Sequence, residues 1–135
     1  MRLMQVIPTI FVLAPCLSAQ ESEVDKRIRT VAGLDVQQTK TFFAELKRAV
    51  EQKDKKAVSA MVAFPTEVDL NGRPRRKVRN RAEFEKNYDE IINQNVFEAV
   101  QKQSYDELFV NWRGIMIGNG QIWFSAFKGP SGKFD

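Results

Sequence analysis

The segment Leu108–Phe127, LFVNWRGIMIGNGQIWFSAF, decides the fold class of this 135-residue chain. It is rich in β-branched and aromatic residues, which favour extended backbone in a pleated sheet. Gly118-Asn119-Gly120 interrupts it with glycines that are typical of a turn. The pattern predicts a long antiparallel hairpin, with a first strand over Leu108–Ile117 and a second over Gln121–Phe127. We expect this hairpin to form the centre of the sheet.

Two helical patterns lie upstream of the long hairpin. Apolar residues recur on one helical face from Asp35 to about Lys53. Asp54 is a good capping residue and begins a second, shorter helix. That helix must end at Phe64-Pro65, because proline disfavours helical backbone in the residue before it. The sequence therefore predicts a helical pair.

A short hairpin and a third helix connect this pair to the long hairpin. Asn71-Gly72 favours a tight turn between a strand over Thr66–Leu70 and a strand that returns through Val78. Asn80 stands three residues before Glu83, a capping-box-like spacing that predicts the start of the third helix. The order helix, helix, short hairpin, helix, long hairpin predicts an α+β fold with helices packed on a curved antiparallel sheet.

The chain divides into three segments. Met1–Ala19 has a positive start, a short apolar run and small residues at its end, which predicts a secretion signal peptide. Residues 20–34 are mostly polar and are expected to form a linker or a loosely docked arm, and residues 35–135 form the domain. The residues before Cys16 are similar to a lipobox, so lipid anchoring is the alternative to cleavage after Ala19. We expect a periplasmic or secreted protein without a transmembrane span, because the apolar run is too short to cross a bilayer.

The composition excludes several kinds of chemistry. Hydrophobic residues make up 43% and charged residues 28%, as in ordinary folded domains. The chain contains no histidine, which removes the commonest general base and the commonest metal ligand. Its only cysteine, Cys16, falls in the predicted leader, so we expect no disulfide, no metal site and no cofactor. The formal net charge of +4 is a mild excess that does not imply nucleic acid as a partner.

Part of the sequence resembles the nuclear transport factor two-like superfamily. The segments that carry the resemblance are Arg79–Phe84 leading to Tyr88-Asp89, Leu108–Asn111 and Gly114–Phe124. The resemblance covers roughly residues 36–135 and implies a cone of helices and curved sheet around an apolar pocket, with the last strand or strands missing from this chain. The superfamily includes isomerases, dehydratases and binding modules, so the resemblance assigns no reaction by itself. It also implies that a homodimer can form through the open face of the sheet.

Several aromatic and apolar residues are candidates for the wall of such a pocket. They are Phe43, Tyr88, Trp112, Met116 and Trp123. Residues of matching parity share a face of a strand, so Trp112 and Met116 point to one side and Trp123 can join them. Such a wall suits an apolar ligand, and it equally suits a solid core packed by the helices. Tyr88 can likewise belong to an apolar helix face with Phe84 while Asp89 faces water.

The densest charge cluster surrounds the short hairpin. Its members are Arg73, Arg75, Arg76, Lys77, Arg79 and Arg81. Alternation along a strand places Arg75, Lys77 and Arg79 on one face, where they can bind an anionic partner or form a solvated edge that discourages strand aggregation. No aromatic residues interleave with them, so the stacking platform for single-stranded nucleic acid is missing.

These features predict an exported, non-catalytic binding module for a small apolar ligand or an envelope protein. One alternative is an isomerase- or dehydratase-like enzyme in the same pocket, with Asp89 or Asp69 as the base and Tyr88 or a tryptophan N–H as the hydrogen-bond donor. The other alternative is docking of the basic hairpin to anionic envelope components.

Overall fold

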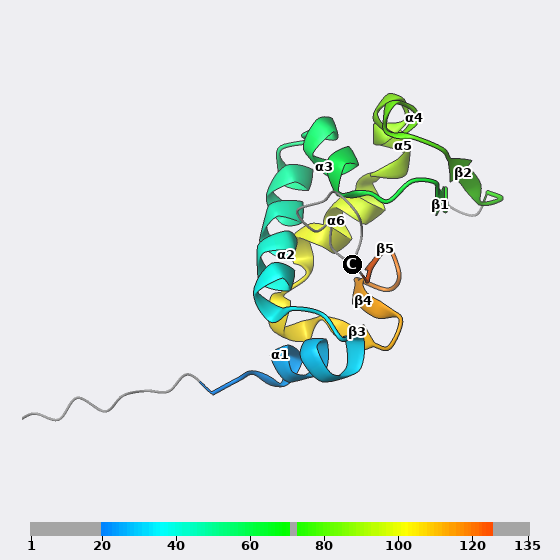
Figure 1. Cartoon of the computed structure of the whole chain (residues 1–135). Coiled ribbons are helices and arrows are strands. Elements are labelled where there is room, and N and C mark those ends of the chain that lie inside the picture. The colour runs from blue at the N-terminus through cyan, green and yellow to red at the C-terminus, as the bar shows by residue number, and fades with distance from the viewer. Residues whose placement is uncertain (1–19, 71–72, 126–135) are drawn as a thin grey trace, which may run out of the picture.

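The computed structural model describes residues 20–70 and 73–125 (Figure 1). The predictions for the leader Met1–Ala19 with Cys16, for the Asn71-Gly72 turn and for the chain from Phe127 onward, including the missing last strand, lie outside the described residues. Among the described helices, none combines the length and the hydropathy that crossing a bilayer requires.

Helices and single helical turns make up most of the described chain. They are α1 (Glu23–Arg27), the π-helical turn η1 (Ile28–Ala32), α2 (Val36–Glu51), α3 (Lys55–Met61), α4 (Arg81–Lys86), α5 (Tyr88–Ile91), α6 (Gln94–Lys102) and the 3-10 turn η2 (Tyr105–Glu107). The predicted helical pair is confirmed as α2 and α3. The predicted third helix is divided at Asn87 into α4 and α5.

The capping side chains fix where these helices begin. Asp35 Oδ1 accepts a hydrogen bond of 2.7 Å from the backbone N–H of Gln38 at the start of α2. Asp54 and Asn80 cap α3 and α4 in the same way, as the sequence predicts. Asn93 caps α6. Each cap satisfies a backbone N–H that the helix itself leaves without a partner.

The strands form two separate antiparallel sheets. The first pairs β1 (Thr66–Val68) with β2 (Arg76–Val78), and the second has the order β3 (Phe109–Asn111), β4 (Gly114–Ile117), β5 (Ile122–Phe124). Figure 1 shows the first sheet beside α4 and β3 of the second sheet near α1. The α+β class, with helices packed on antiparallel sheet, is confirmed.

The predicted first strand of the long hairpin is wrong, because a tight turn divides it. Trp112-Arg113 forms this turn between β3 and β4. Asn111 Oδ1 accepts a hydrogen bond of 2.8 Å from Arg113 N, and Gly114 follows with a φ of 129°. A short polar side chain that bonds to the backbone two residues ahead competes with continued pairing, and a glycine tolerates the positive φ. Trp112 therefore lies in a turn and does not share a strand face with Met116.

The inner face of the three-stranded sheet carries the centre of the core. Val110, Ile115 and Ile117 have no exposed surface. They face the helical layer, where Phe42 of α2 stacks on Phe124 of β5 with ring centroids 4.9 Å apart. The sheet and α2 thus form two packed layers.

Residues 20–34 do not form a linker or a loose arm, as the sequence suggested. Residues 23–32 are helical, and Ile28 is completely buried. The guanidinium of Arg27 donates a hydrogen bond of 2.7 Å to the carbonyl of Val110 in β3. The polar composition of this segment concealed Val24 and Ile28, which are one helical turn apart and face the sheet.

Candidate functional site

The structure does not bring the five predicted pocket residues together. Phe43 is buried in the core beside Tyr105, with ring centroids 5.9 Å apart. Tyr88 is buried on another part of the helical layer, while Met116 and Trp123 lie on the outer side of the sheet. The single aromatic pocket predicted from the sequence is therefore wrong, and its members belong to three different surroundings.

The outer face of the three-stranded sheet presents a row that we call the outer aromatic row: Phe109, Met116 and Trp123. Met116 lies opposite Phe109 on one side and opposite Trp123 on the other. The rings of Phe109 and Trp123 meet edge to face at 6.3 Å. Their exposed fractions are 46% and 45%, so this face points to solvent. The prediction that Met116 and Trp123 share a face is confirmed, but the face is not a pocket wall.

Trp112 stands at the end of this face with 76% of its surface exposed. The guanidinium of Arg113 lies 4.9 Å from its ring centroid. This cation–π contact partly covers the charge of the arginine with the indole face.

A pocket of about 240 Å³ opens beside Tyr88, and we call it the Tyr88 pocket. Its lining residues are Lys53, Tyr88, Asp89, Ile92, Asn93, Gln94 and Phe97. They come from the α2–α3 connection, from α5 and the turn that follows it, and from α6. The pocket contains both polar and apolar groups.

Tyr88 is the unusual residue in the wall of this pocket. Only 2% of Tyr88 is exposed, and within the described chain its buried hydroxyl has no hydrogen-bond partner. Burial, and then the carboxylates of Asp89 and Asp54, raise the pKa of Tyr88 above its ordinary value. The hydroxyl is thus a protonated donor without an acceptor.

Tyr88 and Asp89 confirm the core interpretation. Tyr88 packs edge to face on Phe84 with centroids 6.2 Å apart, while Asp89 faces water and pairs with Lys55 at 3.0 Å. Both residues also line the Tyr88 pocket.

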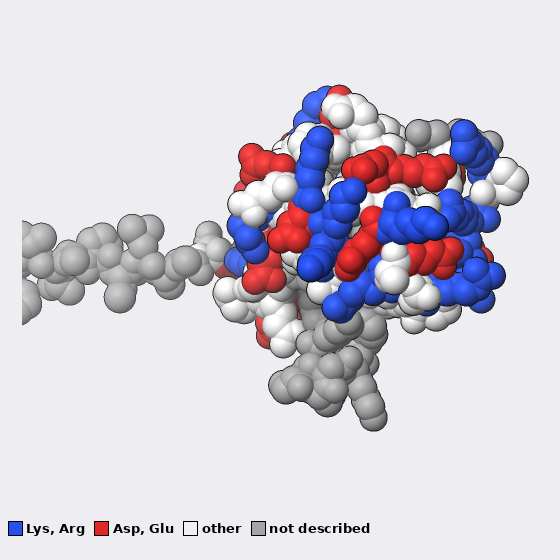
Figure 2. Space-filling view, turned by 90° about the horizontal axis from the view of Figure 1, so that it is seen from above, with Lys and Arg blue, Asp and Glu red and all other residues white. Residues whose placement is uncertain are grey.

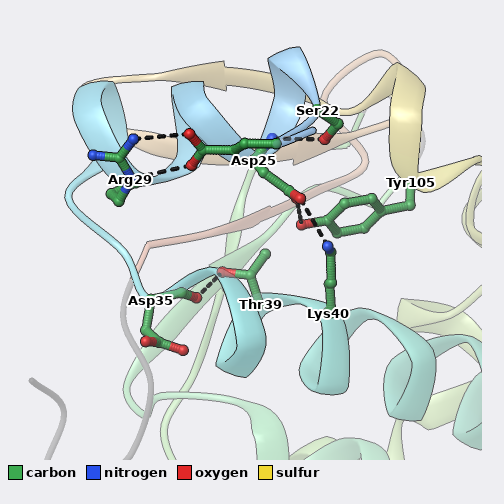
Figure 3. Close-up of polar contacts among 8 residues, drawn as sticks. Ser22, Asp25, Arg29, Asp35, Thr39, Lys40 and Tyr105 are labelled. Carbon is green, nitrogen blue, oxygen red and sulfur yellow. Dashed lines mark hydrogen bonds and ion pairs between the residues drawn. The ribbon is translucent and has the colours of Figure 1, made fainter. Parts of the chain in front are cut away.

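A second polar cluster, which sequence reasoning missed, joins the N-terminal helix to the body of the domain (Figure 3). Asp25 of α1 points between Lys40 of α2 and Tyr105 of η2. Its carboxylate accepts a hydrogen bond of 2.7 Å from Lys40 Nζ and one of 2.8 Å from the Tyr105 hydroxyl. Ser22 caps α1 by accepting from Asp25 N at 3.1 Å. We call Asp25, Lys40 and Tyr105 the Asp25 clamp.

The Asp25 clamp is built to position helices. Burial raises the pKa of Asp25, but the hydrogen bonds from Lys40 and Tyr105 outweigh burial, and the pKa falls below its ordinary value. Burial, together with the hydrogen bond to Asp25, raises the pKa of Tyr105 far above its ordinary value. The three groups bind one another, and all three also line a hollow of about 650 Å³ beside α1, α2 and η2. The sequence signal was Ser22 in a capping position ahead of apolar residues at helical spacing.

The basic hairpin has the alternation that the sequence predicts. In β2, Lys77 is exposed while Val78 is completely buried. Arg75 and Arg79, at odd positions like Lys77, are exposed as well. The predicted basic face is therefore present at the surface.

Carboxylates neutralise part of this basic face. Figure 2 shows lysines and arginines gathered at the β1–β2 end of the molecule with acidic side chains between them. Glu90 pairs with Arg73 at 3.2 Å and with Arg76 at 3.5 Å, and Glu67 lies 4.0 Å from Arg75. This mixture of positive and negative side chains is typical of a solvated edge. Anion binding by the basic hairpin stays a prediction.

Asp69 is the other acidic candidate from the sequence, and it is not built as a catalytic base or a metal ligand. Asp69 is exposed at the end of the first hairpin strand. Across residues 20–70 and 73–125, no group of three or more acidic, cysteine or histidine side chains could hold a metal ion.

Comparison of the chain with protein-family models, with curated proteins and with solved structures found no match. The resemblance to the nuclear transport factor two-like superfamily stays a prediction.

Proposed function

We propose that this domain is a non-catalytic binding module that holds a small ligand in the Tyr88 pocket. The observation that carries the proposal is the buried Tyr88 hydroxyl without a partner. Leaving such a group unpaired costs about 1–3 kcal/mol, so buried polar groups are nearly always hydrogen-bonded. Because the hydroxyl oxygen is closed off from solvent, a ligand whose acceptor satisfies it must displace neighbouring side chains of the pocket wall.

The other walls of the pocket support the same proposal. Ile92 and Phe97 offer apolar surface, and Lys53 brings a charged ammonium group to the same pocket. Ligand sites usually combine apolar walls with a few polar groups in volumes of about 300–1,000 Å³. This pocket measures about 240 Å³, which favours a ligand with few heavy atoms.

Binding is favoured over catalysis because of the surroundings of the carboxylates. The side chain of Asp89 is 79% exposed and pairs with Lys55. A carboxylate becomes an effective general base mainly through burial, which neither Asp89 nor Asp69 has. We place the module outside the cytoplasm, in the periplasm or the medium, on the strength of the predicted signal peptide over Met1–Ala19.

The first test is Tyr88→Phe, with Tyr105→Phe as the matched control. The Tyr88 substitution removes an unpaired hydroxyl and keeps the ring beneath Lys55, so we expect the free energy of unfolding to rise by about 1 kcal/mol. The Tyr105 substitution removes the bond to Asp25 and should lower it by about 1–2 kcal/mol. Urea unfolding measures both values.

Ligand-observed NMR with a library of small polar fragments tests binding itself. Fragments that bind the native protein should lose at least tenfold in affinity on Tyr88→Phe and keep their affinity on Tyr105→Phe. The proposal fails if fragment binding ignores Tyr88→Phe, or if that substitution destabilises the protein as much as Tyr105→Phe does, because the hydroxyl would then have a partner without any ligand.

A further inference from the structure

We infer that the hollow beside the Asp25 clamp is a second ligand site and that it takes an uncharged sugar. The hollow measures about 650 Å³ and lies where α1, α2 and η2 meet, and we call it the clamp hollow. Figure 3 shows the groups that hold these elements together, with Lys40 and Tyr105 pointing toward Asp25. The described lining of the clamp hollow shares no residue with the Tyr88 pocket, so this inference is independent of the proposed function.

The charged groups of the clamp hollow largely neutralise one another. Glu21 binds Arg29 through both carboxylate oxygens, at 3.1 and 2.9 Å. Asp25 pairs with Lys40 at 2.7 Å. The remaining charge of the described lining is the carboxylate of Asp106, which is exposed to water. Water and salt screen an exposed single charge, so charge alone gives this hollow little affinity for an ion.

The same groups keep hydrogen-bonding positions that are free to bind a ligand. Arg29 uses Nε and Nη2 for Glu21, and within the described chain its Nη1 has no partner. Lys40 Nζ donates to Asp25 and carries further N–H donors. In residues 20–70 and 73–125, the carboxylate of Asp106 has neither a hydrogen bond nor an ion pair. The side chains of Arg29 and Lys40 are 58% and 43% exposed, so a ligand can reach them.

A ligand with several hydroxyl groups matches this arrangement of free donors and a free acceptor. A hydroxyl both donates and accepts, so one hydroxyl can accept from Lys40 while its neighbour donates to Asp106. The carboxylate of Asp106 lies near the Tyr105 hydroxyl, because it contributes, after burial and Asp25, to the raised pKa of Tyr105. An amine would use only the acceptor, and an anion only the donors.

The apolar part and the size of the clamp hollow suit a sugar as well. Val36 and the ring of Tyr105 supply apolar surface for the C–H groups of a sugar ring. The volume of about 650 Å³ lies within the range of about 300–1,000 Å³ that is usual for small-molecule sites. The clamp hollow is therefore larger than the Tyr88 pocket and more polar in its lining.

Saturation-transfer NMR tests the inference with glucose, N-acetylglucosamine and cellobiose as probes. We expect binding of at least one sugar, with an affinity that stays within about twofold as the salt concentration is raised. Asp106→Ala should weaken binding about fivefold or more, which corresponds to one lost hydrogen bond. Asp106→Asn should keep most of the affinity, because an amide still accepts and donates. Asp69→Ala is the matched control, since Asp69 is also exposed and lines neither the clamp hollow nor the Tyr88 pocket.

Three outcomes would overturn the inference. The first is a protein that binds none of these sugars. The second is sugar binding that Asp106→Ala does not weaken or that Tyr88→Phe removes, because the sugar then lies elsewhere. The third is preferential binding of methylammonium or glycine that Asp106→Asn abolishes, because the clamp hollow then selects a charge. Circular dichroism of both Asp106 variants separates a lost contact from a lost fold.

Discussion

Among single residues, Gly114 determines where the second sheet turns. Its φ of 129° lies in a region that side chains rarely adopt. A Cβ at this position would collide with the carbonyl oxygen of Phe124 and with Ser125, both backbone or near-backbone atoms of the neighbouring strand end. The residue is therefore a glycine for two reasons, backbone conformation and space.

Gly114→Ala should lower the free energy of unfolding by about 2–4 kcal/mol, the sum of backbone strain and overpacking. Gly33→Ala is the matched control, because Gly33 also has a positive φ, of 68°, but nothing lies within 4 Å of a Cβ built there. Gly33→Ala should lower the free energy of unfolding by only about 1 kcal/mol, which is the cost of the left-handed backbone. Chemical denaturation compares the two variants, and equal losses would show that the close approach to Phe124 does not exist in solution.

Single residues also show how far the sequence could be interpreted. Asp54 and Asn80 predicted two helix starts, because a cap is a local hydrogen bond between residues three apart. The bond from Tyr105 to Asp25 joins residues that are 80 positions apart. No local pattern encodes such a partner, so the Asp25 clamp could not be predicted.

For whole elements, the N-terminal helices gave the largest difference between expectation and structure. The polar surface of α1 and η1 concealed how firmly they are docked, because only two residues of the segment, Val24 and Ile28, are apolar and buried.

Ile28→Ala should lower the free energy of unfolding by about 2–4 kcal/mol through lost burial and a new cavity. Val31→Ala, in the same turn but exposed, should change it by less than about 0.5 kcal/mol.

Thermal unfolding measures this pair, and hydrogen exchange of the α1 amides provides an independent observation. Equal small effects of both substitutions, with fast exchange throughout α1, would restore the loose-arm interpretation. Slow exchange that Ile28→Ala accelerates would show that α1 and η1 unfold together with the sheet.

The strands show a different limit of sequence reasoning. Alternation correctly placed Met116 and Trp123 on one face, because side chains in a strand repeat every two residues. It could not say which face is inside, since β4 is apolar on both. The helices pack on Ile115 and Ile117, which makes the face with these two residues the inner one. The predicted pocket residues Met116 and Trp123 therefore lie on the outer face.

At the scale of the whole molecule, a single cluster links three distant segments of chain. The Asp25 clamp joins α1, α2 and η2, and α1 and η1 in turn support the three-stranded sheet. The two sheets share no strand pairing. Global stability should therefore respond to the ionisation of the clamp.

The free energy of unfolding should fall in acid because of Asp25 and in alkali because of Tyr105. The pKa of Asp25 is lowered by folding, so its contribution is complete above the ordinary value of 3.8 and is lost as the pH falls below it. The pKa of Tyr105 is raised, so its contribution is complete below the ordinary value of 10.0 and is lost as the pH rises above it. Asp25→Asn removes the carboxylate and leaves a neutral amide of the same shape, while the burial that contributes most to the raised pKa of Tyr105 stays in place.

The variant should be less stable at neutral pH by about 1–2 kcal/mol and should approach the native protein at both extremes. Urea titrations at several pH values measure the difference between the two proteins. A difference that stays constant from acid to alkali would mean that Asp25 is not ionised against Lys40 and Tyr105 in the folded state. A difference that narrows only in acid would remove Tyr105 from the clamp and leave the ion pair with Lys40 as the bond that holds the N-terminal helix.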